Sequence, residues 1–257
     1  MRTASTISLV TWNVWFSARD FEPRFRALLD VVRSRDPDVV CFQEIIPESL
    51  ELLLDEPWVR SRYALSDTTG ESFDSYGVVM LSRLPVGSFS FRELPTSMGR
   101  RLLTADVTTA AGPITIGTVH LESMKHNAET RGEQLAEIFP ALRGRGPDSI
   151  LCGDFNFCST WPEENGRIEP DFIDVWPALH PREPGWSEDT TVNRMLEGIE
   201  GRTKKVRYDR VLLRSPVGRW QPRSIELLGT EPISPGEPFV FPSDHFGLAA
   251  VFEASTP

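Results

Sequence analysis

Polar residues that could do chemistry follow apolar runs in this chain. The segment ILCGDFNFC, residues 150–158, turns at Gly153 and then places Asp154 and Asn156 two residues apart. On a strand this spacing puts both polar side chains on one face and Phe155 on the other. The pair could be an ordinary turn that ends a strand, or an anion and a neutral hydrogen-bonding group that face one substrate. The segment alone leaves both interpretations open.

Five more segments place a polar residue at the edge of an apolar run. They are LVTWN with Asn13, VVCFQE with Glu44, ITIGTVH with His120, VRYDRVLL with Asp209, and SDHFGL with Asp244 and His245. Each residue alone has a structural explanation as a turn, a solvated strand end, a buried histidine or an ion-pair partner. Together these explanations require six independent coincidences. The pattern therefore favours one shared site.

The elements that would position these residues can be predicted from periodicity. Strands are predicted at 7–13, 38–44, 76–82, 101–108, 113–120, 149–153, 206–213, 224–228 and 247–253. Helical spacing links Phe25, Leu28, Leu29 and Val32, after Asp20 as the N-cap, and again Leu135, Ile138, Phe139 and Leu142. Short helices are predicted at 47–54 and 171–179, and loops over 159–203 and 230–242. This order predicts an α/β fold, a four-layer sandwich of two packed, mostly antiparallel sheets flanked by helices.

The composition is that of a globular protein. The 257 residues are 40% hydrophobic and contain no repeat or linker, so we expect one catalytic domain over 1–257. No apolar run approaches the roughly 20 residues that cross a bilayer, and the N-terminus has the pattern of a first strand rather than a signal peptide. The three cysteines cannot all pair. We therefore expect an intracellular protein, cytoplasmic or nuclear, that is a monomer without a membrane partner.

The charge excludes one kind of nucleic-acid binder. A net charge of −10 and a pI near 5.0 argue against a protein that coats nucleic acid nonspecifically. They do not exclude an enzyme that binds a phosphate locally. Carboxylates gathered around a divalent cation would themselves contribute to this balance.

The six polar segments, taken in order, carry a resemblance. The series TWN, QE, HLES, GDFN, RYDR and SDH resembles the endonuclease/exonuclease/phosphatase superfamily, whose fold is similar to that of deoxyribonuclease I. HLES, DVW, RYDR, PRSIELLG and FPSDHFGL are most similar to a DNA-repair branch that removes 5′-tyrosyl adducts from DNA ends. The similarity extends from Leu9 to Phe252. It implies a metal-dependent phosphodiesterase that acts on nucleic-acid ends, most simply on DNA.

The resemblance implies a magnesium site. Glu44 would be the direct Mg²⁺ ligand, since a hard cation prefers carboxylate oxygen and keeps most of its waters. Asn13 and Asp244 would hold those waters, and Mn²⁺ would be able to replace Mg²⁺. Phosphodiester hydrolysis uses such a cation on a nonbridging oxygen.

The remaining polar residues would act on the water and the phosphate. By the resemblance, Asp154 would orient and deprotonate the attacking water, while Asn156 would donate to a phosphoryl oxygen without adding negative charge. His245, oriented by Asp209, would donate to the oxygens of the pentacovalent phosphorus. His120 would contact the phosphate from the opposite wall.

Substrate binding is expected from Arg100, Ser123 and Lys125. Ser123 and Lys125 follow His120 and should lie beside the scissile phosphate, while Arg100 should face the nucleic-acid backbone. The chain departs from the branch where an Arg is expected two residues after Asn156, because Cys158 stands there. Losing this Arg weakens the expected contact with DNA, since Arg binds phosphate in a bidentate way.

Two other functions stay open on the sequence. The acidic charge and the missing Arg are also compatible with a phosphatase or phospholipase of the same fold that acts on inositol, sugar or sphingolipid phosphates. A degenerate member that only binds a partner is the non-enzymatic alternative. The complete set of catalytic residues argues against it, because a pseudoenzyme would be expected to have lost at least one.

Overall fold

Two six-stranded sheets pack face to face. The computed structural model describes residues 6–196 and 203–255. The first sheet contains β1 (Thr6–Asn13), β2 (Val39–Ile45), β3 (Ala64–Leu65), β4 (Gly77–Ser82), β13 (Trp220–Leu228) and β14 (Gly247–Ala254). The second contains β5 (Val86–Glu93), β6 (Arg101–Thr109), β7 (Gly112–His120), β8 (Ser149–Asp154), β9 (Ile173–Asp174) and β12 (Asp209–Arg214).

The strand orders are β13-β14-β1-β2-β4-β3 and β5-β6-β7-β8-β12-β9. Only the pairs β1–β2 and β7–β8 are parallel among the strand pairs of the described ranges. Both sheets are therefore mixed and mostly antiparallel, which confirms the predicted fold class. A separate short pair joins β10 (Glu188–Asp189) to β11 (Lys205–Val206).

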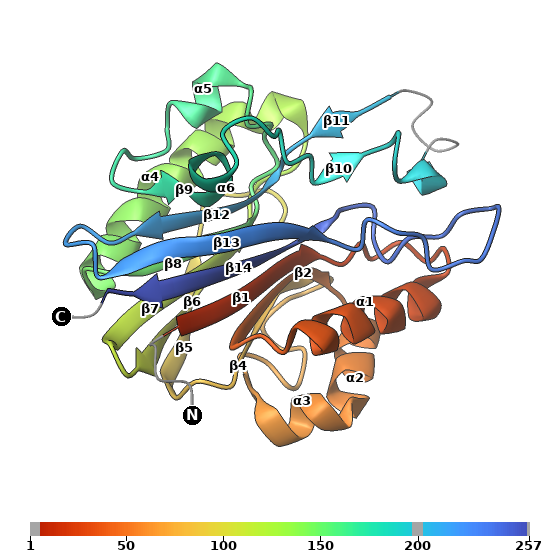
Figure 1. Ribbon diagram of the computed structural model, residues 1–257, viewed down its shortest axis with the longest axis horizontal. Coiled ribbons are helices and arrows are strands. Elements are labelled where there is room, and N and C mark those ends of the chain that lie inside the picture. The colour runs from red at the N-terminus through yellow and green to blue at the C-terminus, as the bar shows by residue number, and fades with distance from the viewer. Residues whose placement is uncertain (1–5, 197–202, 256–257) are drawn as a thin grey trace.

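Helices form the two outer layers. α1 (Phe21–Arg35), α2 (Pro47–Asp55) and α3 (Pro57–Arg62) gather on one side of the strands (Figure 1). The opposite side carries α4 (Ala128–Arg145), α5 (Pro162–Asn165) and α6 (Val175–Leu179) (Figure 1). In the chain, η1 (Lys125–Asn127) precedes α4, and η2 (Arg194–Leu196) follows β10. No helix in the described part of the chain is both long enough and apolar enough to cross a lipid bilayer.

Strand periodicity assigns residues to three cores. Ile7 and Leu9 of β1 belong to the core between the sheets, whereas Val10 and Trp12 belong to the core under α1 and α2. On β8, Ile150 and Cys152 face the other sheet and Leu151 packs with α4. Successive side chains point to opposite faces, so every second residue of these strands faces the other sheet.

The main differences from the predicted elements lie at sheet edges. β5 was not predicted, because this edge strand contains Gly87, Ser88 and Ser90, which have little strand propensity. β13 begins four residues before the predicted strand at 224, and Pro222 is accommodated by a bulge in this other edge strand. Asp20 is the N-cap residue of α1, as predicted, and its carbonyl accepts from Arg24 N over 3.0 Å; it has a left-handed φ of 45°, and its side chain makes no cap hydrogen bond. Part of the predicted loop 159–203 lies outside the described residues.

Candidate active site

The ends of β1 and β8 bring two polar side chains together across the sandwich. Asn13 continues the inward face of β1 after Ile7, Leu9 and Thr11, and Asp154 continues the inward face of β8. Asn13 Nδ2 donates to Asp154 Oδ2 over 3.0 Å. The strand period of two, which the sequence already showed, therefore places both residues at one exit of the interior.

Neighbouring strands add two ionisable residues at the same edge. β7 runs parallel to β8 and pairs His120 with Asp154, while β12 runs antiparallel and pairs Asp209 with Asp154. His120 Nε2 lies 3.5 Å from Asp154 Oδ2. Three predicted site residues thus sit side by side on three adjacent strands.

Glu44 reaches the site through a distortion of β2. The pairing of β2 with β4 shifts register between Phe42 and Ile45, and Glu44 has a left-handed φ of 64°. Gln43 takes the inward position and bonds Thr118 Oγ1, so simple alternation would turn Glu44 to the helix side. The bulge instead brings its carboxylate to the site, where Asn13 Nδ2 donates to Oε1 over 3.2 Å.

The start of β14 brings Asp244 and His245 beside the end of β1, because these two strands are antiparallel. Ser243 Oγ donates to the carbonyl of Asn13 over 2.6 Å, and Trp12 Nε1 donates to the carbonyl of His245 over 2.8 Å. Gly247 is required at this crossing, since a Cβ there would lie 2.4 Å from the Trp12 ring.

His245 and Asp209 form a buried acid–imidazole pair. Their Nδ1 and Oδ2 atoms are 2.7 Å apart, and the side chains are 8% and 0% exposed. Burial alone would lower the pKa of His245, but Asp209, Asp244 and Asp154 raise this pKa well above its usual value. His245 is therefore a protonated donor at neutral pH.

Asp154 stays ionised although it is buried. Burial raises the pKa of its carboxyl, but His245, His120 and hydrogen bonds from Asn156 N and Asn13 Nδ2 outweigh this effect and leave the pKa below its usual value. A buried carboxylate with its charge retained can accept a proton from a water.

Glu44 has the opposite shift. Burial, and then the nearby Asp244, raise the pKa of its carboxyl to about 7. Burial also raises the pKa of Asp244. The two acids repel each other in a partly buried place, and a bound cation would relieve that repulsion.

The donor set here suits a hard divalent cation. Glu44, Asp244 and the Asn13 amide offer oxygen ligands of the kind that Mg²⁺ and Mn²⁺ prefer. A second group, Asp154, Asp209 and His245, has ligand-type atoms within 4.8 Å of one another. In that group the 2.7 Å bond to Asp209 keeps a proton on His245 Nδ1, so this nitrogen is not available as a ligand.

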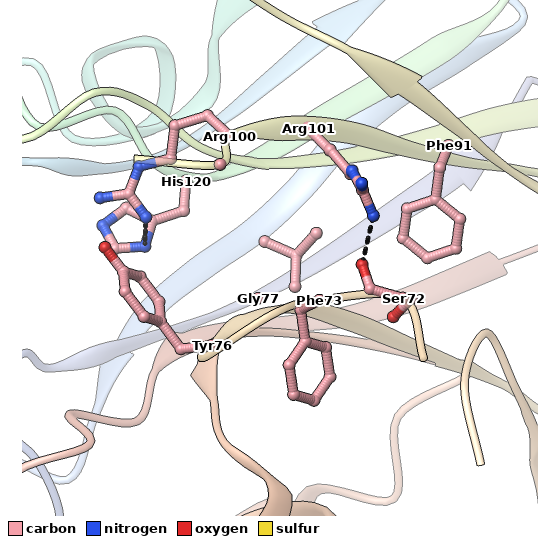
Figure 2. A pocket seen from close by; sticks show the side chains of 10 residues that line it. Ser72, Phe73, Tyr76, Gly77, Phe91, Arg100, Arg101 and His120 are labelled. Carbon is pink, nitrogen blue, oxygen red and sulfur yellow. Dashed lines mark hydrogen bonds between the residues drawn. The ribbon is translucent and has the colours of Figure 1, made fainter. Parts of the chain in front are cut away.

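Arg100 lies inside the site and is 4% exposed. Figure 2 shows its guanidinium against His120 and near the ring of Tyr76. Nη1 lies 3.0 Å from His120 Nδ1, and Nη2 donates to Ser123 Oγ over 2.8 Å. Arg has only donors, so His120 Nδ1 is an acceptor and the ring proton is on Nε2, toward Asp154. Burial and Arg100 lower the pKa of His120 to about 3, which keeps this ring neutral.

A cleft of about 640 Å³ begins beside these residues, with Ser123, Asn156 and Tyr208 among its lining. Asn156 has a left-handed φ of 54°, and its Nδ2 donates to the carbonyl of Leu121 over 3.0 Å. Three cations, Lys125, Lys204 and Lys205, line the same cleft. Exposed Lys125 lies 5.6 Å from the Trp161 ring, and Lys204 lies 5.1 Å from the Tyr208 ring.

Several residues of this site were not singled out from the sequence. Tyr76 and Trp161 carry no local motif, and only the fold brings them beside His120 and Lys125. Arg24 of α1 is 1% exposed and donates to carbonyls of residues 15, 17, 19 and 242, which ties together two loops of the site. A charged residue on the apolar face of the predicted helix was the available signal.

The fold and this set of residues match a known family. A model of the Endonuclease/Exonuclease/phosphatase family matches residues 10–245, and the chain belongs to that family. Tyrosyl-DNA phosphodiesterase 2 of Homo sapiens is 31% identical over 254 residues, which cover 95% of this chain and 67% of the relative. The protein of the same name from Xenopus laevis is 30% identical over 258 residues, with coverages of 97% and 67%.

A solved structure gives the same result. D. rerio TDP2 complexed with single strand DNA product has a TM-score of 0.84 and 25% identity, over 96% of this chain and 99% of that chain. The resemblance that the ordered motifs predicted is therefore confirmed.

Proposed function

We propose that this chain is a divalent-metal-dependent phosphodiesterase that hydrolyses 5′-tyrosyl adducts at DNA ends. One observation carries the proposal: Asn13 holds Asp154 and Asp209 holds His245 at neighbouring element ends, beside the cleft that Asn156 and Tyr208 line. A base and a cationic donor in one site are what phosphodiester hydrolysis requires. The choice of tyrosine as the leaving group rests on the similarity to tyrosyl-DNA phosphodiesterase 2.

Asp154 accepts the proton of the attacking water. A new bond forms between the water oxygen and phosphorus, and the bond between phosphorus and the tyrosyl oxygen breaks. Tyrosine leaves with the electron pair of that bond and takes a proton from solvent, and the DNA keeps a 5′-phosphate. His245 and the Nε2 proton of His120 donate to the phosphoryl oxygens as charge develops on them. Asn13 keeps the Asp154 carboxylate in place through the 3.0 Å bond.

Glu44 would hold the cation, with Asn13 and Asp244 beside it on the shell of bound water. Mg²⁺ is the cation we propose, with Mn²⁺ as a substitute, and when bound it supplies positive charge to a nonbridging oxygen. Burial, and then the charge of Asp244, raise the pKa of Glu44 to about 7, and this supports the assignment because a bound cation would offset both effects.

The cleft beyond Asn156 would take the nucleic-acid strand. Lys125 is exposed at its wall and could contact phosphates, and the rings of Trp161 and Tyr208 could stack with bases. The ammonium group of Lys125 lies over the Trp161 ring, and that of Lys204 lies over the Tyr208 ring. A bound strand would replace both contacts, because its bases would stack on the rings and its phosphates would pair with the ammonium groups. Since Cys158 cannot supply the phosphate contact of an Arg, these groups are the available replacement.

A substrate panel tests the proposal. The protein is incubated with Mg²⁺ and a 5′-tyrosyl oligonucleotide, plain single- and double-stranded DNA, RNA with a poly(A) tail, and inositol and lipid phosphates. We expect release of free tyrosine and a 5′-phosphate from the first substrate at a rate well above all others. Preferential turnover of inositol or lipid phosphates would support the phosphatase alternative instead. Binding of the oligonucleotide without turnover of any substrate would support the non-enzymatic alternative.

A further inference from the structure

A buried carboxylate that has no role in the proposed reaction lies close to the site. Glu122, two residues after His120, is 1% exposed. Its carboxylate contacts the turn that connects β5 to β6, residues 94–100. A buried carboxylate is costly unless hydrogen bonds satisfy it.

The turn supplies three donors to this carboxylate. Oε1 of Glu122 accepts from Ser97 N over 2.9 Å and from Ser97 Oγ over 2.6 Å. Oε2 accepts from Thr96 Oγ1 over 2.5 Å. The same Thr96 oxygen accepts from the backbone N–H of Arg100 over 3.1 Å. A hydrogen-bonded chain therefore runs from Glu122 through Thr96 to the backbone of Arg100.

A residue of α4 fastens the same turn. Gln134 Oε1 accepts from Glu122 N over 2.9 Å, and Gln134 Nε2 donates to the carbonyl of Pro95 over 2.8 Å. The amide thus joins the backbone of Glu122 to the backbone of the turn. The turn is therefore held both by the Glu122 side chain and by Gln134 of α4.

The side chain of Arg100 returns to the same strand end. Its guanidinium bonds His120 Nδ1 and Ser123 Oγ, on either side of Glu122 in the sequence. The backbone of Arg100 and its side chain are therefore both fixed by residues 120–123. Loosening the turn would let the guanidinium move away from His120.

We propose that Glu122 is a positioning residue for Arg100. It holds the turn 94–100 so that the guanidinium reaches His120 Nδ1 and keeps the ring proton on Nε2, toward the scissile phosphate. The part of this inference that concerns the phosphate rests on the proposed function. The link between Glu122 and the His120 tautomer does not.

The test therefore uses a readout that needs no substrate. Imidazole ¹⁵N chemical shifts report which nitrogen of a neutral histidine carries the proton. For His120 in the wild type we expect the Nε2–H tautomer alone. Glu122→Gln removes the charge and one acceptor, and Arg100→Ala removes the donor; we expect both to give a mixture of the two tautomers. Asp38→Asn is the matched control, since Asp38 is also a buried carboxylate that accepts from a serine N–H and hydroxyl, at the opposite end of β1.

Kinetics separate positioning from a general loss of structure. Glu122→Gln should lower kcat/KM roughly 10- to 100-fold in the wild-type background, the scale expected of a misplaced group. It should change kcat/KM less than about 2-fold once Arg100 is alanine, because the two losses share one cause. Thr96→Val, an exposed substitution that breaks the same chain, serves if Glu122→Gln does not fold.

Two results would overturn the inference. One is an unchanged Nε2–H tautomer of His120 in Glu122→Gln, or in Thr96→Val if Glu122→Gln does not fold. The other is an equal effect of Glu122→Gln with and without Arg100. Failure of the proposed substrate alone would leave the tautomer result intact, so the two ideas fail separately.

Discussion

His245 Nδ1 lies 2.7 Å from Asp209 Oδ2, and the pair is buried where β12 and the segment before β14 meet. Because the Asp209 carboxylate hydrogen-bonds this ring, its effect on catalysis should depend on His245. The second oxygen of Asp209, Oδ1, is buried and has no hydrogen-bond partner among the described residues.

Asp209→Asn and His245→Ala should therefore be strongly non-additive. We expect His245→Ala to lower kcat/KM by roughly 10²- to 10⁴-fold, and Asp209→Asn by a smaller factor. The double variant should match His245→Ala, because Asp209 has nothing to act on once the ring is gone. Steady-state kinetics on the 5′-tyrosyl oligonucleotide measure this. Losses that multiply would show that the two residues do not act as a pair.

Glu44 should couple cation binding to pH. Its pKa of about 7 in the cation-free protein means that it is protonated at lower pH and must lose this proton to bind a cation. The affinity for Mg²⁺ or Mn²⁺ should rise as pH increases toward about 7 and level off above that value. Calorimetry in buffers of different ionisation enthalpy should detect the released proton.

Glu44→Gln is the matched control for the calorimetry. The substitution should abolish both the proton release on cation binding and the activation by Mg²⁺. Chelation should abolish turnover of the wild type. An affinity that is constant from about pH 5.5 to about pH 8.5 would contradict the role of Glu44.

Lys125 should contribute a salt-dependent contact with the strand. Lys125→Ala should raise KM for an oligonucleotide and reduce the slope of log KM against log salt concentration by about 1, as loss of one phosphate contact does. Turnover of a small phosphodiester should change little. Arg223→Ala, which removes a cation that is 75% exposed on β13, should leave the slope unchanged. Arg100→Ala should differ from both by lowering kcat as well, because Arg100 is buried against His120.

A wild-type KM that does not respond to ionic strength would argue against a nucleic-acid substrate. A small phosphate ester would give that result, and Lys125→Ala would then have no slope to reduce.

Asp67, which follows β3, should make the stability of the fold depend on pH. Its carboxylate is 7% exposed and accepts hydrogen bonds from Thr69 N, Gly70 N and Ser72 N. Burial would raise the pKa of Asp67, but these bonds and the Ser72 hydroxyl leave it below its usual value. A lowered folded-state pKa gives stability that is present above the unfolded-state pKa and lost as pH falls through the folded-state pKa.

Asp67→Asn should therefore lower the free energy of unfolding at neutral pH by about 1–3 kcal/mol. The difference from the wild type should shrink as the pH falls below about 4, because the wild-type carboxyl is then protonated too. Urea unfolding at several pH values measures this. A difference that stays constant with pH would mean that the carboxylate charge does not contribute.

Strand periodicity explains how much of the site could be predicted. Asn13, His120 and Asp154 follow inward-facing residues at intervals of two, and Asp209 precedes Val211 and Leu213 at the same interval, so a strand prediction already assigns each to the inward face. Asp244 and His245, which precede β14, reach the same edge once β14 pairs with β1. These positions depend on local pattern and could be predicted without the fold.

Other parts of the site depend on contacts that no local pattern encodes. Glu44 faces Asn13 and His120 because of a bulge with positive φ, which neither propensity nor alternation signals. Arg24 and Glu122 are buried charges, and their hydrogen-bond partners come from distant turns. The edge strand β5 is formed by pairing with β6 rather than by its own sequence. Tertiary contacts therefore determine these features.

The central claim is that Asp154 activates the water that attacks the phosphorus. Single-turnover cleavage of a 5′-tyrosyl oligonucleotide, measured beside equilibrium binding for the wild type and Asp154→Asn, tests it most directly. The substitution keeps the shape of the side chain and removes the base. We predict that the variant binds the oligonucleotide within about threefold of the wild type but cleaves it roughly 10²- to 10⁴-fold more slowly. Cleavage by Asp154→Asn at the wild-type rate would contradict the claim.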